Sequence, residues 1–118
     1  MTPDEASSPI TYVRWQGTTC IARAGGDITV ERTAGLQDDL LGLVGERPER
    51  LVVDFRAVAF IDSSGMASLV KVLSRARKEG VELVLAGMND RIRGVFEIAR
   101  LDRIFHIADE VPQDTEGG

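Results

Sequence analysis

Cysteine, histidine and long apolar runs are all scarce in this sequence. Its 118 residues include one cysteine, Cys20, and one histidine, His106. One cysteine cannot form an internal disulfide, and one cysteine with one histidine cannot supply a cysteine-rich zinc site. No apolar run approaches the roughly 20 residues that a membrane-spanning helix needs. Disulfide-stapled, zinc-bound and membrane-spanning classes of protein are therefore not expected.

The sequence also has little positive charge to offer a nucleic acid. Fourteen Lys and Arg residues stand against 19 Asp and Glu, which gives a net charge of −5. The excess acids lie near the two ends, and the central part is almost balanced, so no basic footprint for nucleic acid emerges. The acidic N-terminus is not typical of a secretory signal, and we expect a cytoplasmic protein. We expect one domain at 10–108, with flexible tails at 1–9 and 109–118.

Apolar periodicity predicts strands that alternate with helices. Two short β-branched segments, 11–16 and 18–24, predict an antiparallel pair, and Gly25-Gly26-Asp27 predicts a turn after it. Amphipathic patterns predict three helices, at 31–44, 64–79 and 90–100. Compact apolar runs predict further strands, at 50–55, 81–86 and 104–107. This order indicates a single α/β domain, with a mixed four- to five-stranded sheet and helices mainly on one face.

No catalytic constellation is recognisable. His106 lies between two apolar residues and is expected to be structural, and Cys20 is expected to be a small core residue. No phosphate-binding glycine loop and no metal-loop spacing occurs. A hydrolase with Ser63 as its nucleophile would need a nearby base, and no histidine is placed to serve. We therefore expect neither an enzyme nor a cofactor or metal of its own.

The most informative segment is 54–65. Its apolar stretch, Val58–Ile61, leads to Asp62-Ser63-Ser64-Gly65, which opens the second amphipathic helix. Backbone N–H groups in the first turn of a helix lack partners and favour anions. Two interpretations stay open from the spacing alone. Ser63 or Ser64 is simply the helix N-cap, or a hydroxyl is displayed where a phosphoryl group can be accommodated.

This segment resembles the signature of the STAS superfamily, whose stand-alone members include anti-sigma factor antagonists. The family pattern is an Asp that ends a central strand, a short loop, an apolar residue, and then D-S-S-G or D-S-T-G opening a helix. The matching residues are Asp54, Phe60, Ile61, Asp62, Ser63, Ser64 and Gly65. Gly26-Asp27-Ile28 is similar to the family's G-E-L-D turn, and Val95, Phe96, Leu101 and Phe105 fit its third helix and following turn. The resemblance covers roughly residues 11–107.

The resemblance implies a phosphorylation-switched protein-binding module that regulates transcription. In the family, the unphosphorylated antagonist binds an anti-sigma factor, often itself a serine kinase, and so frees a sigma factor. Phosphorylation of the first Ser of D-S-S-G blocks this binding. Carried over, the phosphorylated residue is Ser63, with Ser64 as the competing acceptor. The implied partner-binding residues are Asp27, Asp62, Ser63, Ser64, Gly65, Ser68 and Lys71.

The basic residues of the second helix and the oligomeric state complete these expectations. Arg75 and Lys78 recur with Lys71 on one helix face, and an ordinary solvated face explains them equally well. We expect a monomer or weak homodimer, with no direct nucleic-acid or membrane partner.

Two features depart from the family pattern. Thr29 stands where the G-E-L-D turn ends in Asp. Residues 108–118 contain Pro112, Gly117 and Gly118, which disfavour the family's C-terminal helix. These departures leave an alternative open: a structural STAS subunit of a lipid-transport ABC complex, or of a stress-signalling scaffold.

Overall fold

Strands and helices alternate along the chain in the order that the apolar periodicity predicts. The computed structural model describes residues 8–113. The strands are β1 (Ile10–Gln16), β2 (Thr19–Ile28), β3 (Arg50–Ile61), β4 (Glu82–Ala86) and β5 (His106–Ala108). The helices are α1 (Thr33–Gly45), α2 (Ser63–Glu79) and α3 (Asp90–Ile98), and two short 3₁₀ turns are η2 (Val30–Arg32) and η3 (Leu101–Arg103). The predicted α/β class is confirmed.

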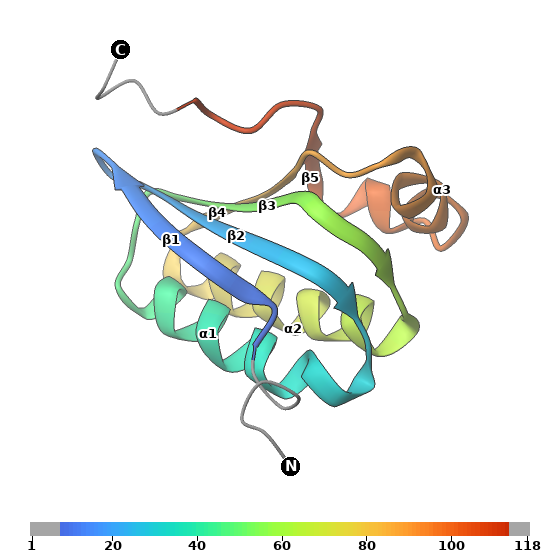
Figure 1. Cartoon of the computed structure of the whole chain (residues 1–118). Coiled ribbons are helices and arrows are strands. Elements are labelled where there is room, and N and C mark those ends of the chain that lie inside the picture. Colours follow the sequence, from blue (N-terminus) through green and yellow to red (C-terminus); the bar gives the residue numbers. More distant parts are fainter. Residues whose placement is uncertain (1–7, 114–118) are drawn as a thin grey trace.

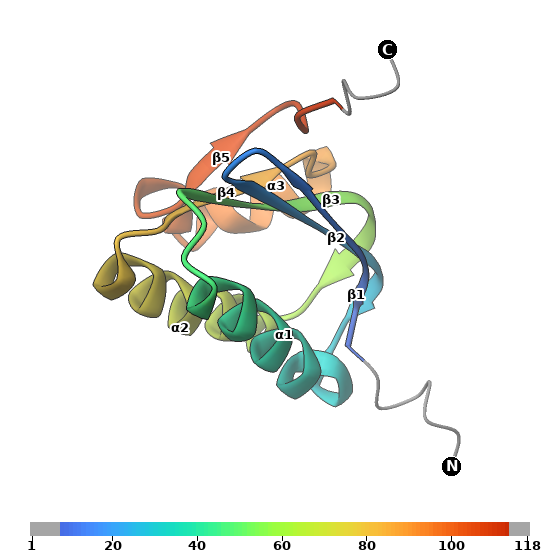
Figure 2. The same cartoon turned by 90° about the vertical axis from the view of Figure 1, so that its left-hand side faces the viewer.

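The five strands form one mixed sheet in the order β1-β2-β3-β4-β5. β1 and β2 are antiparallel because a tight turn at Gly17 joins them, whereas a helix connects each of the later, parallel pairs. α1 and α2 lie side by side under one face of the sheet, and α3 lies apart from them (Figures 1 and 2). The prediction of helices mainly on one face is therefore confirmed.

The main core lies between the sheet and this pair of helices. α1 buries Leu36, Leu40 and Val44 at intervals of one helical turn. α2 buries a wider stripe, made of Gly65, Ser68, Leu69, Val72, Leu73 and Ala76. Phe96 of α3 packs edge-on against Phe105, with ring centroids 5.8 Å apart. Each buried Leu, Val or Phe side chain among them contributes about 1.5–3 kcal/mol relative to its exposed state.

The far ends of β2 and β3 differ from the prediction. β2 passes through Gly25 and Gly26 without turning, and β3 runs to Ile61 without ending at residue 55. The two strands shift register beside these glycines, and Gly26 has a φ of 78°. Glycine adopts such an angle without the cost that a Cβ brings, so the pair forms bulges inside a paired strand. The parallel partner overrides the local turn signal and carries Asp27 to a position beside Phe60.

The other face of the sheet carries a small second cluster of apolar side chains. Its members are Ile21, Val52, Val84, Ala86 and Val111. Val111 belongs to the segment 109–113, which contacts β1 and α3: Arg14 of β1 donates to the carbonyl of Pro112, and Arg93 of α3 pairs with Asp109. No helix occurs in the described part of this segment. The expected tail boundaries stay predictions, and residues 1–7 and 114–118 lie outside the described residues.

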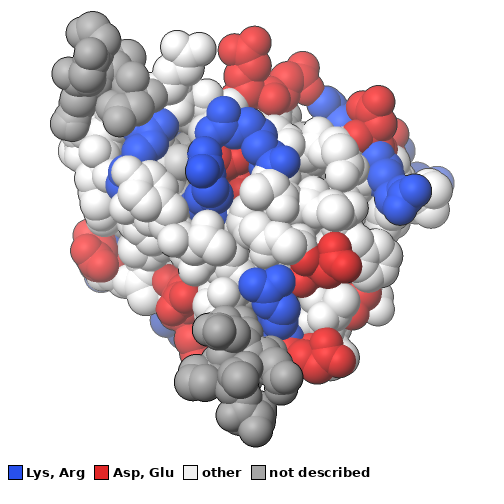
Figure 3. Space-filling model, viewed as in Figure 1, with Lys and Arg blue, Asp and Glu red and all other residues white. Residues whose placement is uncertain are grey.

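A buried carboxylate lies on the same face, at Asp54 of β3. Its side chain is 2% exposed and accepts bonds from Arg56 at 2.9 Å and from Arg23 at 3.5 Å. Burial alone would raise the pKa of Asp54, but the hydrogen bonds and charge of the Arg56 guanidinium outweigh burial and lower it. Figure 3 shows basic side chains gathered on this face. The family's strand-ending Asp therefore has a structural role here, within an ion-paired cluster.

Candidate functional site

Asp62 joins two segments of the chain at the start of α2. Its Oδ1 accepts a hydrogen bond from the backbone N–H of Gly65 at 3.0 Å and from the Ser64 hydroxyl at 2.6 Å. Its Oδ2 accepts from the backbone N–H of Val30 at 3.1 Å. The Ser64 hydroxyl is the main reason that the pKa of Asp62 lies below its ordinary value, and the two backbone donors add to it. Asp62, and neither serine, is therefore the N-cap of α2.

The two serines that follow Asp62 differ in what their hydroxyls do. Ser64 donates to Asp62 and is half-buried. Ser63, the first residue of α2, is exposed, and its hydroxyl has no hydrogen-bond partner among residues 8–113. The interpretation of either serine as the helix cap is therefore wrong. The free hydroxyl lies in the first helical turn, where backbone N–H groups favour a negative charge.

Gly65 holds the start of α2 close to the ends of β2 and β3. A Cβ built on Gly65 would lie 2.7 Å from Cγ1 of Ile61 and 2.8 Å from Cγ2 of Ile28. Both distances are well inside van der Waals contact, so only glycine fits without a shift of its neighbours. The close approach determines how far Ser63 stands above the sheet edge.

Exposed apolar side chains occur in the segments next to Ser63. Val30, whose N–H binds Asp62, is 65% exposed, and Phe60, two residues before Asp62, is 43% exposed. Val70, two turns along α2 from Ser63, is also exposed. Large apolar residues in the open are common at protein–protein contacts. We name Asp27, Val30, Phe60, Ser63 and Val70 the Ser63 surface.

The backbone near Asp27 is fixed by an arginine from the following turn. Arg32 donates to the carbonyl of Asp27 at 2.8 Å and to that of Gly25 at 3.2 Å. Thr29, the residue that replaces the family's acid, donates through its hydroxyl to Glu31 at 2.8 Å. The carboxylate next to Thr29 is therefore that of Glu31, which comes from the same short turn.

Five of the seven predicted site residues are at least partly exposed, and the other two, Gly65 and Ser68, are buried. Asp27 and Lys71 are exposed, and Gly65 is buried at the contact just described. Ser68 is only 7% exposed, because its position on α2 falls on the stripe that faces the sheet. The expectation that Ser68 lies on the exposed face of α2 is wrong. Val30 and Phe60 were not predicted as site residues, because apolar periodicity does not reveal that an apolar residue in a strand or turn is exposed.

The remaining candidate reactive groups, Cys20 and His106, occupy structural positions. Cys20 is fully buried, and burial raises its pKa to about 11. His106 is exposed on β5, with Nδ1 3.0 Å from an oxygen of Glu82. Among residues 8–113 no three His, Cys, Asp or Glu side chains gather as a metal site would require. Within the same range, no helix is long and apolar enough to cross a membrane.

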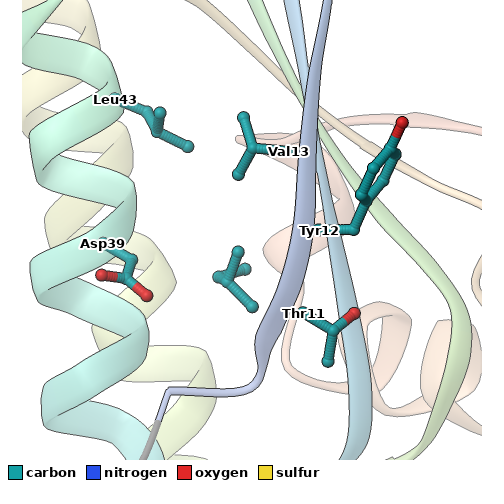
Figure 4. Close-up of a pocket in the computed structure, with 6 residues that line it drawn as sticks. Thr11, Tyr12, Val13, Asp39 and Leu43 are labelled. Atoms are coloured by element: carbon teal, nitrogen blue, oxygen red, sulfur yellow. The ribbon is translucent and has the colours of Figure 1, made fainter.

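A cavity lies between β1 and α1, away from Ser63. It measures about 330 Å³. Val13 of β1 points into it toward Leu43 and Asp39 of α1, whereas Tyr12 points to the other side of the strand (Figure 4). Apart from Asp39, no charged side chain lines it.

Comparison with known proteins agrees with this fold. The family model of the STAS domain matches residues 12–113. The Anti-sigma-B factor antagonist of Staphylococcus aureus is 27% identical over 85 residues, which cover 72% of this chain and 79% of the relative. The crystal structure of an anti-sigma factor antagonist from Mycobacterium paratuberculosis superposes with a TM-score of 0.75 at 25% identity, over 89% of this chain and 92% of the other.

A similar fold also occurs in a protein of another class. The structure of a sulfate transporter family protein from Wolinella succinogenes has a TM-score of 0.70 and 24% identity, over 81% of this chain and 80% of the other. At that identity the likeness concerns the fold alone. The chain belongs to the STAS domain family, and its curated relatives include proteins named as anti-sigma factor antagonists.

Proposed function

We propose that this protein is an anti-sigma factor antagonist switched by phosphorylation of Ser63. Unphosphorylated, it binds an anti-sigma factor through the Ser63 surface and so releases a sigma factor for transcription. A serine kinase, often the anti-sigma factor itself in this family, then modifies Ser63 and ends the binding. The protein acts in the cytoplasm as a binding module, without catalysis of its own.

The observation that supports this proposal most is the contrast between the two neighbouring hydroxyls. Ser63 is exposed and unbonded within the described chain, whereas the Ser64 hydroxyl is committed to Asp62 at 2.6 Å. A kinase must remove the hydroxyl proton and approach the oxygen from solvent, and only Ser63 offers both. Phosphorylation of Ser64 would also remove a bond that holds the start of α2.

A phosphate on Ser63 is compatible with the folded domain but not with a covered surface. The group adds about −1.5 to −2 charges at neutral pH, at a helix terminus that favours anions. Asp62 next to it limits the stabilisation and keeps the phosphate in solvent. A partner packed on Val30 and Phe60 would have to desolvate this charge, at a cost of several kcal/mol unless it offers cations. Loss of binding then needs no large conformational change.

Phosphopeptide mapping with matched variants tests the acceptor. The wild-type protein, Ser63→Ala and Ser64→Ala are incubated with ATP and the serine kinase captured from native lysate of the source organism. We expect phosphate on wild type and on Ser64→Ala, and none on Ser63→Ala. Phosphate on Ser64 alone, or full modification of Ser63→Ala, would contradict the assignment.

Capture of the anti-sigma factor tests the switch. We expect wild type and Ser63→Ala to retain the anti-sigma factor, and Ser63→Asp to retain at least tenfold less, which is about 1.4 kcal/mol. Ile98→Asp adds the same charge on α3, at a side chain that is 86% exposed, and is expected to bind like wild type. Equal capture by Ser63→Asp and wild type would refute the switch.

A second candidate is a structural STAS subunit of a lipid-transport ABC complex or of a stress-signalling scaffold. Thr29 favours it, because the chain places a hydroxyl bonded to Glu31 where the family pattern has an acid. The segment 109–113, which packs on the sheet without forming a helix, favours it as well. Co-purification with transporter subunits, together with no phosphorylation by any captured kinase, would support this candidate over the antagonist.

A further inference from the structure

A basic groove lies between α1 and α2, on the helical side of the molecule. It is lined by Gln37 and Leu41 of α1 and by Lys71, Ser74, Arg75 and Lys78 of α2, and measures about 270 Å³. We name these six residues the α1–α2 groove. No acidic residue lines it, although the chain as a whole carries a net charge of −5. The groove is therefore locally opposite in charge to the protein that contains it.

The three cations of the groove have no partner within the described chain. Lys71, Arg75 and Lys78 take part in no ion pair or hydrogen bond among residues 8–113. Nearby exposed arginines do find acids: Arg47 pairs with Glu79 at 3.0 Å, and Arg50 pairs with Glu82 at 3.0 Å. The groove thus gathers these three cations, unpaired in the described part of the chain, on one face of α2.

The spacing of these three cations along α2 makes them repel one another, which lowers the stability of the helix. Lys71 and Arg75 are four residues apart, Arg75 and Lys78 three, so like charges face each other across single turns. The negative end of the helix dipole offsets part of this repulsion for Lys78, which lies in the last turn, but not for Lys71. An acidic group bound from outside would offset the rest.

The groove is continuous with the surface that carries Ser63. Ser63, Val70 and Ser74 fall on one stripe of α2, and Ser74 lines the groove. Lys71 lies eight residues after Ser63, or about 12 Å along the helix axis at about 1.5 Å per residue. A partner that covers a usual interface of about 800 Å² per side reaches both places at once.

We propose that the α1–α2 groove binds a carboxylate-rich segment of the anti-sigma factor, as a second contact area beside the Ser63 surface. This inference rests on the function proposed above and adds the chemistry of the partner. An acidic protein segment fits better than a nucleic acid, because the net negative charge of the chain repels an extended polyanion. The groove contributes attraction and orientation, and Ser63 contributes the switch.

Charge reversal tests the groove with the anti-sigma factor captured in the experiment above. The affinity of the purified factor is measured by calorimetry at 50 and 300 mM NaCl, for wild type and for Lys71→Glu/Arg75→Glu. Arg91→Glu is the control, since Arg91 is an exposed arginine of α3 without a partner among residues 8–113. Thermal unfolding checks that each variant is folded, and Lys71→Gln/Arg75→Gln replaces the reversal if it is not.

The outcomes separate the two proposals. We expect the double reversal to weaken binding about tenfold or more at 50 mM NaCl and to flatten the salt dependence, with the control within about twofold of wild type. Equal affinity of the double reversal and wild type overturns the groove while leaving the antagonist function intact. A labelled 20-base-pair DNA is tested in the same way. If wild type binds it and the double reversal does not, the groove is a nucleic-acid site instead. If wild type binds no anti-sigma factor, the proposed function fails and the groove inference fails with it.

Discussion

Replacing Asp62 with alanine removes three hydrogen bonds at once from the start of α2. The lost N-cap bond to Gly65 costs about 1 kcal/mol, and the lost bond to the N–H of Val30 costs about another 1 kcal/mol. The Ser64 hydroxyl can turn to water and adds little. We expect the free energy of unfolding to fall by about 2 kcal/mol, and the melting temperature by about 8 °C for a domain of this size.

The pH dependence of this loss of stability shows whether it comes from the ionised carboxylate of Asp62 or from lost packing of the side chain. The pKa of Asp62 is lower in the folded state than in the unfolded chain. Its stabilisation is therefore fully present above the unfolded pKa of about 4 and is lost as the pH falls through the folded value. Urea unfolding of wild type and Asp62→Ala should differ at pH 7 and converge in acid.

Two control variants sharpen the measurement. Asp62→Asn keeps a neutral acceptor and should lose less stability, with little dependence on pH. Asp38→Ala removes an exposed acid of α1 that has no partner among residues 8–113, and should change stability by less than about 0.5 kcal/mol. A loss below about 0.5 kcal/mol for Asp62→Ala, or a loss unchanged at pH 3, would refute the role of Asp62 as the cap.

Three further substitutions test the packing around the site and the ion pairs on the sheet. Gly65→Ala should cost about 1–3 kcal/mol in urea unfolding, because the new Cβ meets Ile61 and Ile28. Gly42→Ala is the control, because a Cβ at this position in α1 meets nothing within 4 Å. This variant should gain about 0.5–1 kcal/mol of stability. A similar effect of both changes would contradict the close approach of Gly65 to Ile61 and Ile28. Asp54→Asn should cost about 2 kcal/mol at pH 7. Because the folded pKa of Asp54 is lowered, this cost should shrink as the pH falls below about 4 and vanish once the pH falls through the folded pKa. A pH-independent cost would argue against the ion pairs.

The order of the elements could be predicted because apolar periodicity reports which faces are buried. The stripes on α1 and α2 were predicted in this way. The extended ends of β2 and β3 were not, because glycines signal a turn locally and only the partner strand makes them part of a sheet.

The candidate site was predictable in place but not in detail. Asp62, Ser63 and Ser64 are all good N-cap residues, so propensity cannot decide at which of them the helix begins. Tertiary contacts determine that Asp62 is the cap. Its carboxylate accepts from the N–H of Val30, which is distant in sequence, and Gly65 packs closely against the sheet. Ser68 was misplaced because a serine near the surface of a helix resembles a solvated residue until its neighbours are known.

The anchored start of α2 bears on how Ser63 can be recognised. Ser63 lies within a helical turn whose position is fixed by Asp62 and Gly65, and the turn cannot extend without breaking those contacts. An enzyme that accepts extended peptides as added strands would first have to unwind it. Under the function proposed above, we expect recognition of Ser63 to depend on a discontinuous epitope assembled from Asp27, Phe60 and α2, and not on a linear motif.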